Sequence, residues 1–204
     1  MNIKIIDYKA GNSQSVQHAI ARLGYESSFA KTGDDLVGAT HIILPGVGSA
    51  KATMESLTEQ EMIPTLEKLV LTDKIPFLGV CVGLQVLFDH SEEGDVKCLG
   101  WLPGKVKRFD NKRVRVPQMG WNNVSFQKSA GIIDPSEAAK NYYYFVNSYY
   151  AVPDDEFDTW GVSMYGLPFM AAVHRDNIYG TQFHVEKSGA AGLQLLDGFV
   201  KGGK

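Results

Sequence analysis

Apolar residues follow two alternating patterns in the first half of the chain. Short apolar runs predict four strands, at residues 2–6, 25–30, 40–44 and 75–80. Apolar residues at a period near 3.6 predict two helices, at residues 13–23 and 61–71. Because strands and helices take turns along the chain, we expect a parallel sheet with helices on both of its faces.

The second half is richer in short, aromatic, β-forming segments. Strands are predicted at residues 105–109, 124–127, 142–146, 149–152, 169–174 and 177–183. Turn signals such as Asp110-Asn111 and Asp176-Asn177 separate them, which favours largely antiparallel strands. A closing helix is predicted at residues 188–200, with Ser188 as its N-cap.

No repeat or low-complexity linker separates the two halves, so we expect the sheet to continue through both. The prediction is a single domain over residues 1–204: an α/β fold with a three-layer open mixed sheet, helices on both faces and antiparallel strands in the second half. In such a sheet the active site lies at the carboxyl ends of the strands. Asp7, Cys81 and the loop at residues 45–48 all follow predicted strands and should share that edge.

Composition narrows the class of protein. The chain has 44% hydrophobic and 21% charged residues, as is ordinary for a globular protein, and a net charge of −3 gives no electrostatic reason to expect a nucleic-acid partner. Its apolar runs are shorter than a membrane span, and it opens on a strand-like segment rather than a signal-peptide pattern. With only two cysteines, we expect a cytoplasmic protein with reduced thiols, in which Cys98 is a passive, partly buried thiol.

The segment Gly79-Val80-Cys81-Val82-Gly83 is a cysteine version of the nucleophile elbow. Glycines on both sides permit a sharp turn from the preceding apolar strand into a helical segment at residues 84–88. A thiol at this turn stands clear of the backbone at a helix N-terminus, where free N–H groups favour the thiolate. The elbow alone leaves two readings open, a nucleophile or a packed core cysteine.

A cysteine nucleophile needs a base, and the base needs a group that orients it. His184 and Glu186 lie at the end of the last predicted strand. In an extended chain, side chains two positions apart point to the same side. The carboxylate can then orient the imidazole, as in nucleophile–His–acid triads. The competing reading is an ordinary strand-end histidine beside a solvated glutamate. The other histidines lie in less suitable contexts: His18, His41, His90 and His174.

Acyl transfer also needs an oxyanion hole. The segment Pro45-Gly46-Val47-Gly48 can present backbone N–H groups, although a plain turn has the same composition. The N–H of Val82, directly after the nucleophile, is the natural second donor. The sequence has neither metal-ligand spacing nor a nucleotide-binding glycine motif, so we expect no metal and no cofactor.

Taken together, these motifs resemble the class I (triad) glutamine amidotransferases, which have a flavodoxin-like fold. The superfamily resemblance rests on residues 79–85 and on Gln182-Phe183-His184-Val185-Glu186-Lys187-Ser188. Further segments resemble the HisH family, the glutaminase subunits of imidazole glycerol phosphate synthase: residues 6–12, 44–48, 117–122 and 144–150. These matches span nearly the whole chain, in order.

The resemblance implies a reaction and its residues. Cys81 attacks the side-chain amide of L-glutamine, His184 protonates the departing ammonia, Glu186 orients His184, and the thioester is hydrolysed to glutamate. Gly48 and Val82 line the oxyanion site. Glutamine's α-groups are held by Gln85, Glu93, Ser148 and Tyr149. The ammonia passes to a HisF-type (β/α)8 synthase that makes imidazole glycerol phosphate and AICAR in histidine biosynthesis, and the contact with it is expected at Asn12, Met119, Trp121 and Lys187.

Four positions depart from the family pattern. Lys9 stands where the family has glycine, Gln118 and Asn147 where it has histidine, and Val185 where it has proline. None is a member of the triad, but their segments lie near the active site and the partner contact. Two alternatives therefore stay open: a HisH-type paralogue that supplies ammonia for a sugar amidine in surface polysaccharide synthesis, and an inactive regulatory protein with the triad fold.

Overall fold

An eight-stranded mixed sheet forms the centre of the molecule in the computed structural model, which describes residues 1–8 and 12–202. Five of its strands are parallel, in the order β2-β1-β3-β4-β14. They span Ile3–Ile6 (β1), Ser27–Ala30 (β2), His41–Gly46 (β3), Phe77–Cys81 (β4) and Ile178–Thr181 (β14). This is the order of a doubly wound, flavodoxin-like sheet, which confirms the predicted fold class.

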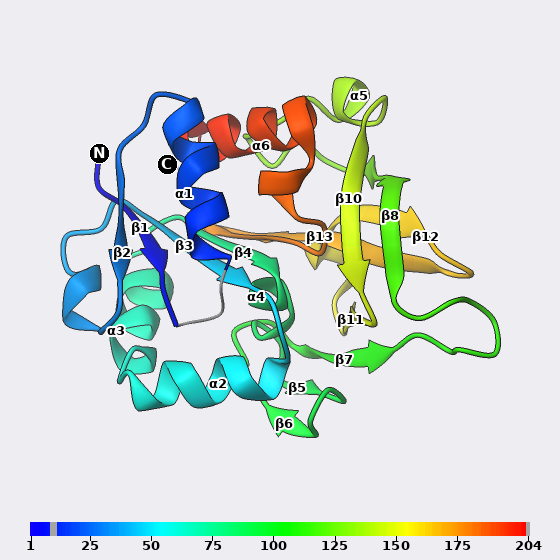
Figure 1. Cartoon of the computed structure of the whole chain (residues 1–204), viewed down its shortest axis with the longest axis horizontal. Coiled ribbons are helices and arrows are strands. Elements are labelled where there is room, and N and C mark those ends of the chain that lie inside the picture. Colours follow the sequence, from blue (N-terminus) through cyan, green and yellow to red (C-terminus); the bar gives the residue numbers. More distant parts are fainter. Residues whose placement is uncertain (9–11, 203–204) are drawn as a thin grey trace.

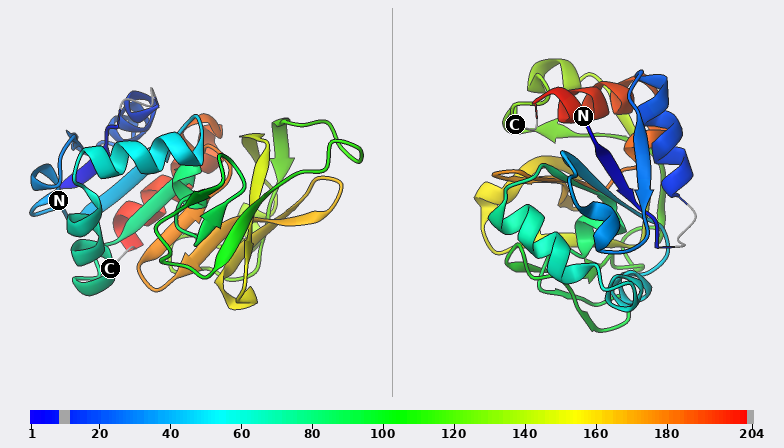
Figure 2. Two further views of the ribbon diagram at one scale, coloured as in Figure 1. Left: turned by 90° about the horizontal axis from the view of Figure 1, so that it is seen from below. Right: turned by 90° about the vertical axis from the view of Figure 1, so that its left-hand side faces the viewer.

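Helices cover both faces of these parallel strands, as Figures 1 and 2 show. One face carries α1 (Ser13–Arg22) and the C-terminal α6 (Gly189–Gly202), which contact each other. The other face carries α2 (Ala50–Glu59) and α3 (Ile63–Glu67), which continues into the π-helical turn η2 (Lys68–Thr72). Burial on both faces explains why the central strands β3 and β4 are almost uniformly apolar rather than alternating.

Three antiparallel strands extend the main sheet beyond β14: β13 (Pro168–Arg175), β12 (Thr159–Met164) and the short β9 (Ser125–Phe126). The sheet therefore continues through both halves of the chain, as predicted. The remaining strands form two smaller sheets. One of them pairs β8 (Gln118–Asn123) with β10 (Tyr142–Asn147). The other has the strand order β11-β7-β5-β6. Its strands span Tyr149–Pro153 (β11), Gly104–Arg108 (β7), His90–Ser91 (β5) and Val96–Lys97 (β6).

Short helical turns complete the fold: η1 (Asp34–Leu36), α4 (Val82–Gln85), α5 (Pro135–Ala138), η3 (Glu156–Asp158) and η4 (Val185–Lys187). One contiguous apolar core joins the sheets to the helices, with Trp160, Tyr143 and Phe77 among its largest fully buried side chains. Among the described residues, no helix has both the length and the apolar character needed to cross a bilayer.

Some predicted elements differ from the structure. Helix α2 was not predicted, although Ser49 accepts a hydrogen bond from Ala52 N as its N-cap and the buried positions 50, 53, 54 and 57 have helical spacing. The helix predicted at residues 61–71 begins later, because Glu61 has a φ of +52° and closes the preceding turn. The helical segment predicted at residues 84–88 is instead α4, which starts directly after Cys81 and ends at Gln85.

The last predicted strand joins the two halves of the sheet, because β14 pairs in parallel with β4 and antiparallel with β13. One further prediction is wrong in detail. Ser188 does precede α6, but its hydroxyl is used elsewhere: it donates to His184 O at 2.6 Å and accepts from Tyr144 N at 3.0 Å. The residue predicted as a helix cap therefore joins β10 to the strand end that carries His184.

Candidate active site

Cys81 occupies a strained turn at the carboxyl end of β4. Its φ of +56° and ψ of −106° place it outside the ordinary strand and helix regions, and α4 begins at the next residue. A non-glycine residue in such a conformation is held there by its surroundings, and strain of this kind clusters at functional sites. The strand–turn–helix geometry predicted for the elbow is thus present.

Close backbone packing explains the glycines around the turn. A Cβ added to Gly83 would lie 2.0 Å from Leu44 O, and one added to Gly79 would lie 2.4 Å from Gly83 O. The structure therefore requires glycine at both positions because α4 is pressed against β3 and β4. Neither glycine has a positive φ, so their role is close approach rather than an unusual conformation.

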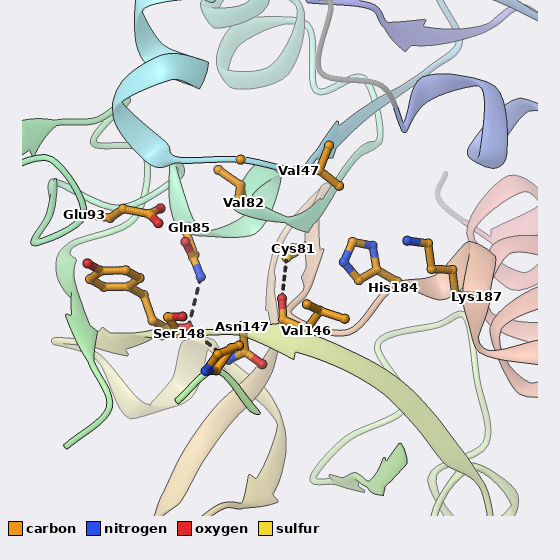
Figure 3. A pocket seen from close by; sticks show the side chains of 13 residues that line it. Val47, Cys81, Val82, Gln85, Glu93, Val146, Asn147, Ser148, His184 and Lys187 are labelled. Carbon is orange, nitrogen blue, oxygen red and sulfur yellow. Dashed lines mark hydrogen bonds between the residues drawn. The ribbon is translucent and has the colours of Figure 1, made fainter. Parts of the chain in front are cut away.

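His184 follows β14, the neighbour of β4 in the sheet, and Figure 3 shows its imidazole turned toward Cys81. Its Nδ1 lies 2.9 Å from Glu186 Oε1, and both side chains are buried. Residues 185–187 form the 3-10 turn η4, so the carboxylate reaches the ring through a turn and not through strand alternation. The sequence analysis therefore identified the right pair of residues but predicted an extended backbone between them, where the structure has a turn.

Backbone hydrogen bonds fix this turn, although Val185 stands where proline would have restricted φ. Lys187 N donates to His184 O at 3.1 Å, and Ser188 N donates to Val185 O at 3.2 Å. His184 N itself donates to Tyr144 O at 2.9 Å, so β10 holds the histidine in place. Val185 is fully buried.

Electrostatics favour the protonated form of His184. Burial alone would lower its pKa, but hydrogen bonding and charge interaction with Cys81 and Glu186 outweigh burial and raise the pKa to about 9. Burial likewise opposes the ionised form of Glu186, yet the interaction with His184 and a hydrogen bond from Asn12 lower its pKa overall. An imidazolium paired with a carboxylate is the state that can donate a proton to a leaving group.

Asn12, expected at a partner contact, has a hydrogen-bond partner within the chain. It occupies the N-cap position of α1, but its side chain is buried and donates to Glu186 Oε1 at 2.9 Å instead of capping the helix. Asn12 thus contacts the acid of the proposed triad, a role that nothing in its local sequence indicated.

A pocket of about 290 Å³ opens beside the sulfur of Cys81. It is lined by all four residues expected to hold glutamine's α-groups, together with both residues expected at the oxyanion site: Gln85, Glu93, Ser148, Tyr149, Gly48 and Val82. Burial raises the pKa of Glu93, whose Oε2 accepts a hydrogen bond from Ala50 N at 2.9 Å. The predicted pocket residues thus come together from α4, β11, the turn between β10 and β11, and the loops after β3 and β5.

The loop after β3 is tied to Tyr8, which lies just beyond the carboxyl end of β1. Burial raises the pKa of Tyr8 to about 12, with hydrogen bonds from Thr53 and from the backbone of Val47 as partly opposing effects. Val47 and Gly48 both line the pocket, and Gly48 has a φ of +101°.

Three residues expected at a partner contact are exposed. Met119 and Trp121 alternate with less exposed residues along β8 and are themselves 67% and 56% exposed. The Trp121 ring makes an edge contact with Tyr144 of β10, the strand that holds His184. Lys187 is exposed and lines the pocket. An apolar surface thus lies on the two-stranded sheet next to the active site.

The positions that depart from the family pattern are buried wherever the structure describes them. Gln118 and Asn147 are cross-strand partners in β8 and β10, 3% and 5% exposed, on the face opposite Met119 and Trp121. Lys9 lies outside the described residues. The described departures therefore do not change the exposed face of this sheet.

The second cysteine is a buried thiol away from this pocket. Burial raises the pKa of Cys98 to about 11, so it stays protonated at neutral pH, as expected for a passive thiol. Within residues 1–8 and 12–202, no group of three or more His, Cys, Asp or Glu side chains is arranged to hold a metal ion.

Comparison with known proteins gives a consistent match. The family described as glutamine amidotransferase class-I matches residues 4–201. The chain is 45% identical over 202 residues to the imidazole glycerol phosphate synthase subunit HisH of Desulfitobacterium hafniense, covering 98% of this chain and 93% of that one. It is 42% identical to the chloroplastic imidazole glycerol phosphate synthase hisHF of Arabidopsis thaliana, covering 97% of this chain and 34% of that one. A crystal structure of a glutamine amidotransferase superposes with a TM-score of 0.76 at 18% identity over 98% of this chain and 97% of that one, which shows a shared fold.

Proposed function

Since the chain belongs to the class-I glutamine amidotransferases and, within them, to the HisH subunits of imidazole glycerol phosphate synthase, we propose that it hydrolyses L-glutamine with Cys81, His184 and Glu186 and passes the ammonia to a synthase. The observation that carries this proposal is the meeting of three distant segments in one pocket. Cys81 lies at the end of β4, His184 faces it from the end of β14, and Glu186 is 2.9 Å from the imidazole.

In the proposed first step, the Cys81 thiolate attacks the side-chain carbonyl carbon of glutamine. A C–S bond forms, the C–N bond breaks, and His184 gives its proton to the departing nitrogen, which leaves as ammonia. The raised pKa of His184 supports its role as the proton donor, because the imidazolium is populated at neutral pH. We assign the stabilisation of the oxyanion to the backbone N–H groups of Gly48 and Val82, and the presence of both residues in the pocket lining supports this assignment.

In the second step, water attacks the γ-glutamyl thioester. The neutral His184 takes a proton from this water, the C–S bond breaks, and glutamate leaves while the thiolate–imidazolium pair is restored. Glu186 holds the ring in one orientation throughout and stabilises its charge, and Asn12 supports that carboxylate. Every proton taken up by His184 is thereby accounted for, with no cofactor in the cycle.

The pocket favours one orientation of glutamine. Both amide hydrogens of Gln85 are used within the protein, on Tyr149 O at 3.1 Å and on Gln182 Oε1 at 3.0 Å, so this side chain offers only its buried oxygen to a ligand. Glu93 is also an acceptor. We therefore place the α-ammonium of glutamine toward Gln85 and Glu93, and its α-carboxylate toward Ser148 and Tyr149.

We propose a HisF-type (β/α)8 synthase as the partner, docked on the exposed face of the β8–β10 sheet at Met119 and Trp121. The hisHF relative supports a close association, because its name joins both subunits and this chain matches 34% of its length. Exposed aromatic and methionine side chains are typical of the centre of an interface. The ammonia would enter the partner to make imidazole glycerol phosphate and AICAR in histidine biosynthesis, in the cytoplasm, where thiols such as Cys81 stay reduced.

A complementation experiment tests the pathway. The chain is expressed in a histidine auxotroph that lacks its own glutaminase subunit, on medium poor in ammonium. Growth, and no growth with Cys81→Ala, is the expected result. Failure of soluble, folded chain to restore growth with a cognate HisF-type partner would instead favour the alternative of ammonia supply to a sugar-amidine synthase.

A covalent probe tests whether the chain turns over glutamine at all. Diazo-oxo-norleucine, a glutamine analogue, should add to Cys81 and not to Cys98, and the adduct is located by mass spectrometry of the two cysteine peptides. An unmodified Cys81, even with the partner present, would support the inactive regulatory alternative.

A further inference from the structure

The sulfur of Cys81 has a polar neighbour besides His184 that the proposed reaction does not use. Gln182 Nε2 lies 3.6 Å from Sγ, within hydrogen-bond range for sulfur, and Gln182 is completely buried. Its backbone N donates to Ala171 O at 2.8 Å, which fixes the residue at the end of β14. A buried amide that points at a reacting atom needs an explanation beyond packing.

We propose that Gln182 donates a hydrogen bond to the Cys81 thiolate and that a relay through Gln85 to the backbone of Tyr149 holds this donor in place. The inference rests on the proposed function, in which this thiolate is the nucleophile. It assigns to Gln182 the positioning of the nucleophile and the stabilisation of its charge.

The direction of the relay follows from one backbone carbonyl. Tyr149 O can only accept, so Gln85 must present its NH₂ group to it. The same NH₂ group donates to Gln182 at 3.0 Å, which requires the Gln182 oxygen on that side. Gln182 must therefore turn its own NH₂ group toward Cys81, and the sulfur receives a donor whichever charge it carries.

A second polar contact of the sulfur explains why a donor is needed. Val146 O lies 3.8 Å from Sγ, where a thiol can donate to it but a thiolate faces the negative end of a carbonyl dipole. Gln182 offsets this unfavourable contact with a neutral donor, and hydrogen bonds to the charged form of a group favour that form. It does so without supplying a proton, so His184 keeps its proton for the leaving ammonia. The same donor stabilises the thiolate again when the thioester breaks.

The relay also reaches the substrate pocket. Gln85 lines the pocket and its oxygen is buried with no hydrogen-bond partner among the described residues. A ligand that binds this oxygen therefore contacts the residue that holds the donor to the nucleophile. The titratable groups around Cys81, any of which can affect its reactivity, are Tyr8, Glu93, His184, Glu186 and Lys187.

Alkylation of Cys81 by iodoacetamide tests the relay without glutamine and without a partner. The rate is measured between pH 6 and pH 9 from the Cys81 peptide by mass spectrometry, with the Cys98 peptide as an internal reference. Gln182→Met keeps the length of the side chain but removes the donor, and Gln182→Glu keeps the acceptor for Gln85 while placing an oxygen near the sulfur. Gln194→Glu, at an exposed position of α6, is the matched control.

Both Gln182 variants should react about tenfold more slowly than wild type at pH 7, with the pH midpoint of the reaction raised by about one unit, while the control is unchanged. Circular dichroism verifies folding, and if Gln182→Met does not fold, Gln182→Glu decides. Folded variants that react within about twofold of wild type at every pH would overturn the relay. If glutamine is not hydrolysed but alkylation responds as expected, the proposed function fails and the relay stands.

Discussion

Asn12 Nδ2 donates a hydrogen bond of 2.9 Å to Glu186 Oε1, although the two residues are 174 positions apart in the chain. The same oxygen lies 2.9 Å from His184 Nδ1. One carboxylate oxygen is therefore shared between an amide donor and the imidazole, while Glu186 Oε2 is buried without a partner among the described residues. This places the N-terminus of α1 in direct contact with the acid that orients the proposed base.

Replacing Asn12 tests that contact. Asn12→Ala removes a donor from Glu186, so the carboxylate holds the ring less firmly, and we expect the glutaminase kcat to fall about tenfold at saturating partner, with little change in KM. Asn12→Asp should lower kcat further, because it puts a second carboxylate beside the first. If partner affinity falls and kcat at saturation does not, Asn12 belongs to the interface, as its sequence position suggested.

Removing the nucleophile should separate two activities of the complex. Cys81→Ala is expected to abolish glutamine-dependent synthesis and to leave synthesis from added ammonium salts near the wild-type rate, because in the proposed complex the synthase site lies on the partner. Both rates are measured by product formation with purified partner. Loss of both activities would mean that the cysteine is needed for the structure.

Histidine titrations should move in opposite directions within one spectrum. The pKa of His184 is raised to about 9, so its ring should keep its proton well above pH 6.5, whereas burial and the nearby Lys128 lower the pKa of His174, so its ring should lose its proton below pH 6.5. Two-dimensional NMR of the imidazole nitrogens gives both midpoints. Cys81→Ala should lower the His184 midpoint, because it removes a favourable partner and leaves the burial, and should leave His174 unchanged. A His184 midpoint at or below 6.5 in wild type would contradict the proposed imidazolium.

The elbow glycine should be intolerant of a methyl group. In Gly83→Ala the added Cβ meets Leu44 O at 2.0 Å, so we expect the free energy of unfolding to fall by about 3 kcal/mol or more, or the chain not to fold. Gly24→Ala is the control, because nothing lies within 4 Å of its added Cβ. Only the φ of +83° opposes this substitution, and we expect it to lower the free energy of unfolding by about 1 kcal/mol. Urea unfolding measures both, and equal costs would show that close packing at the elbow is not what requires glycine.

The exposed Trp121 of β8 should contribute to binding of the proposed partner more than to the stability of the fold. Trp121→Ala changes a side chain that is 56% exposed, so we expect unfolding to shift by less than about 0.5 kcal/mol while partner affinity falls at least about tenfold. Val37→Ala is the matched control: Val37 is 68% exposed but follows η1, which contacts β2 at the other edge of the main sheet. Calorimetric titration with the partner gives the affinities. An unchanged affinity for Trp121→Ala would place the contact elsewhere.

Local patterns in the sequence were enough to predict most of the main sheet and to select the three residues of the candidate triad. The apolar runs identified four of the five parallel strands because buried strands leave a clear hydrophobic signature, whereas β14 was expected among the largely antiparallel strands of the second half. The paired glycines around Cys81 signalled the elbow because only glycine fits where α4 presses on β3 and β4. His184 and Glu186 were singled out because they come at the end of the last predicted strand, and β14 and β4 are neighbours in the sheet.

Only the tertiary structure decided how these groups are supported. Gln182 reaches Cys81 across 101 residues and Asn12 reaches Glu186 across 174, and such pairs depend on which strands become neighbours in the sheet. The same holds for Gln118 and Asn147, whose opposition in β8 and β10 buries both and leaves Met119 and Trp121 exposed on the other face. A residue's own sequence neighbours fix its local backbone preference, but its distant partners follow from strand order and register, because a shift of one residue in register reverses which face each side chain occupies.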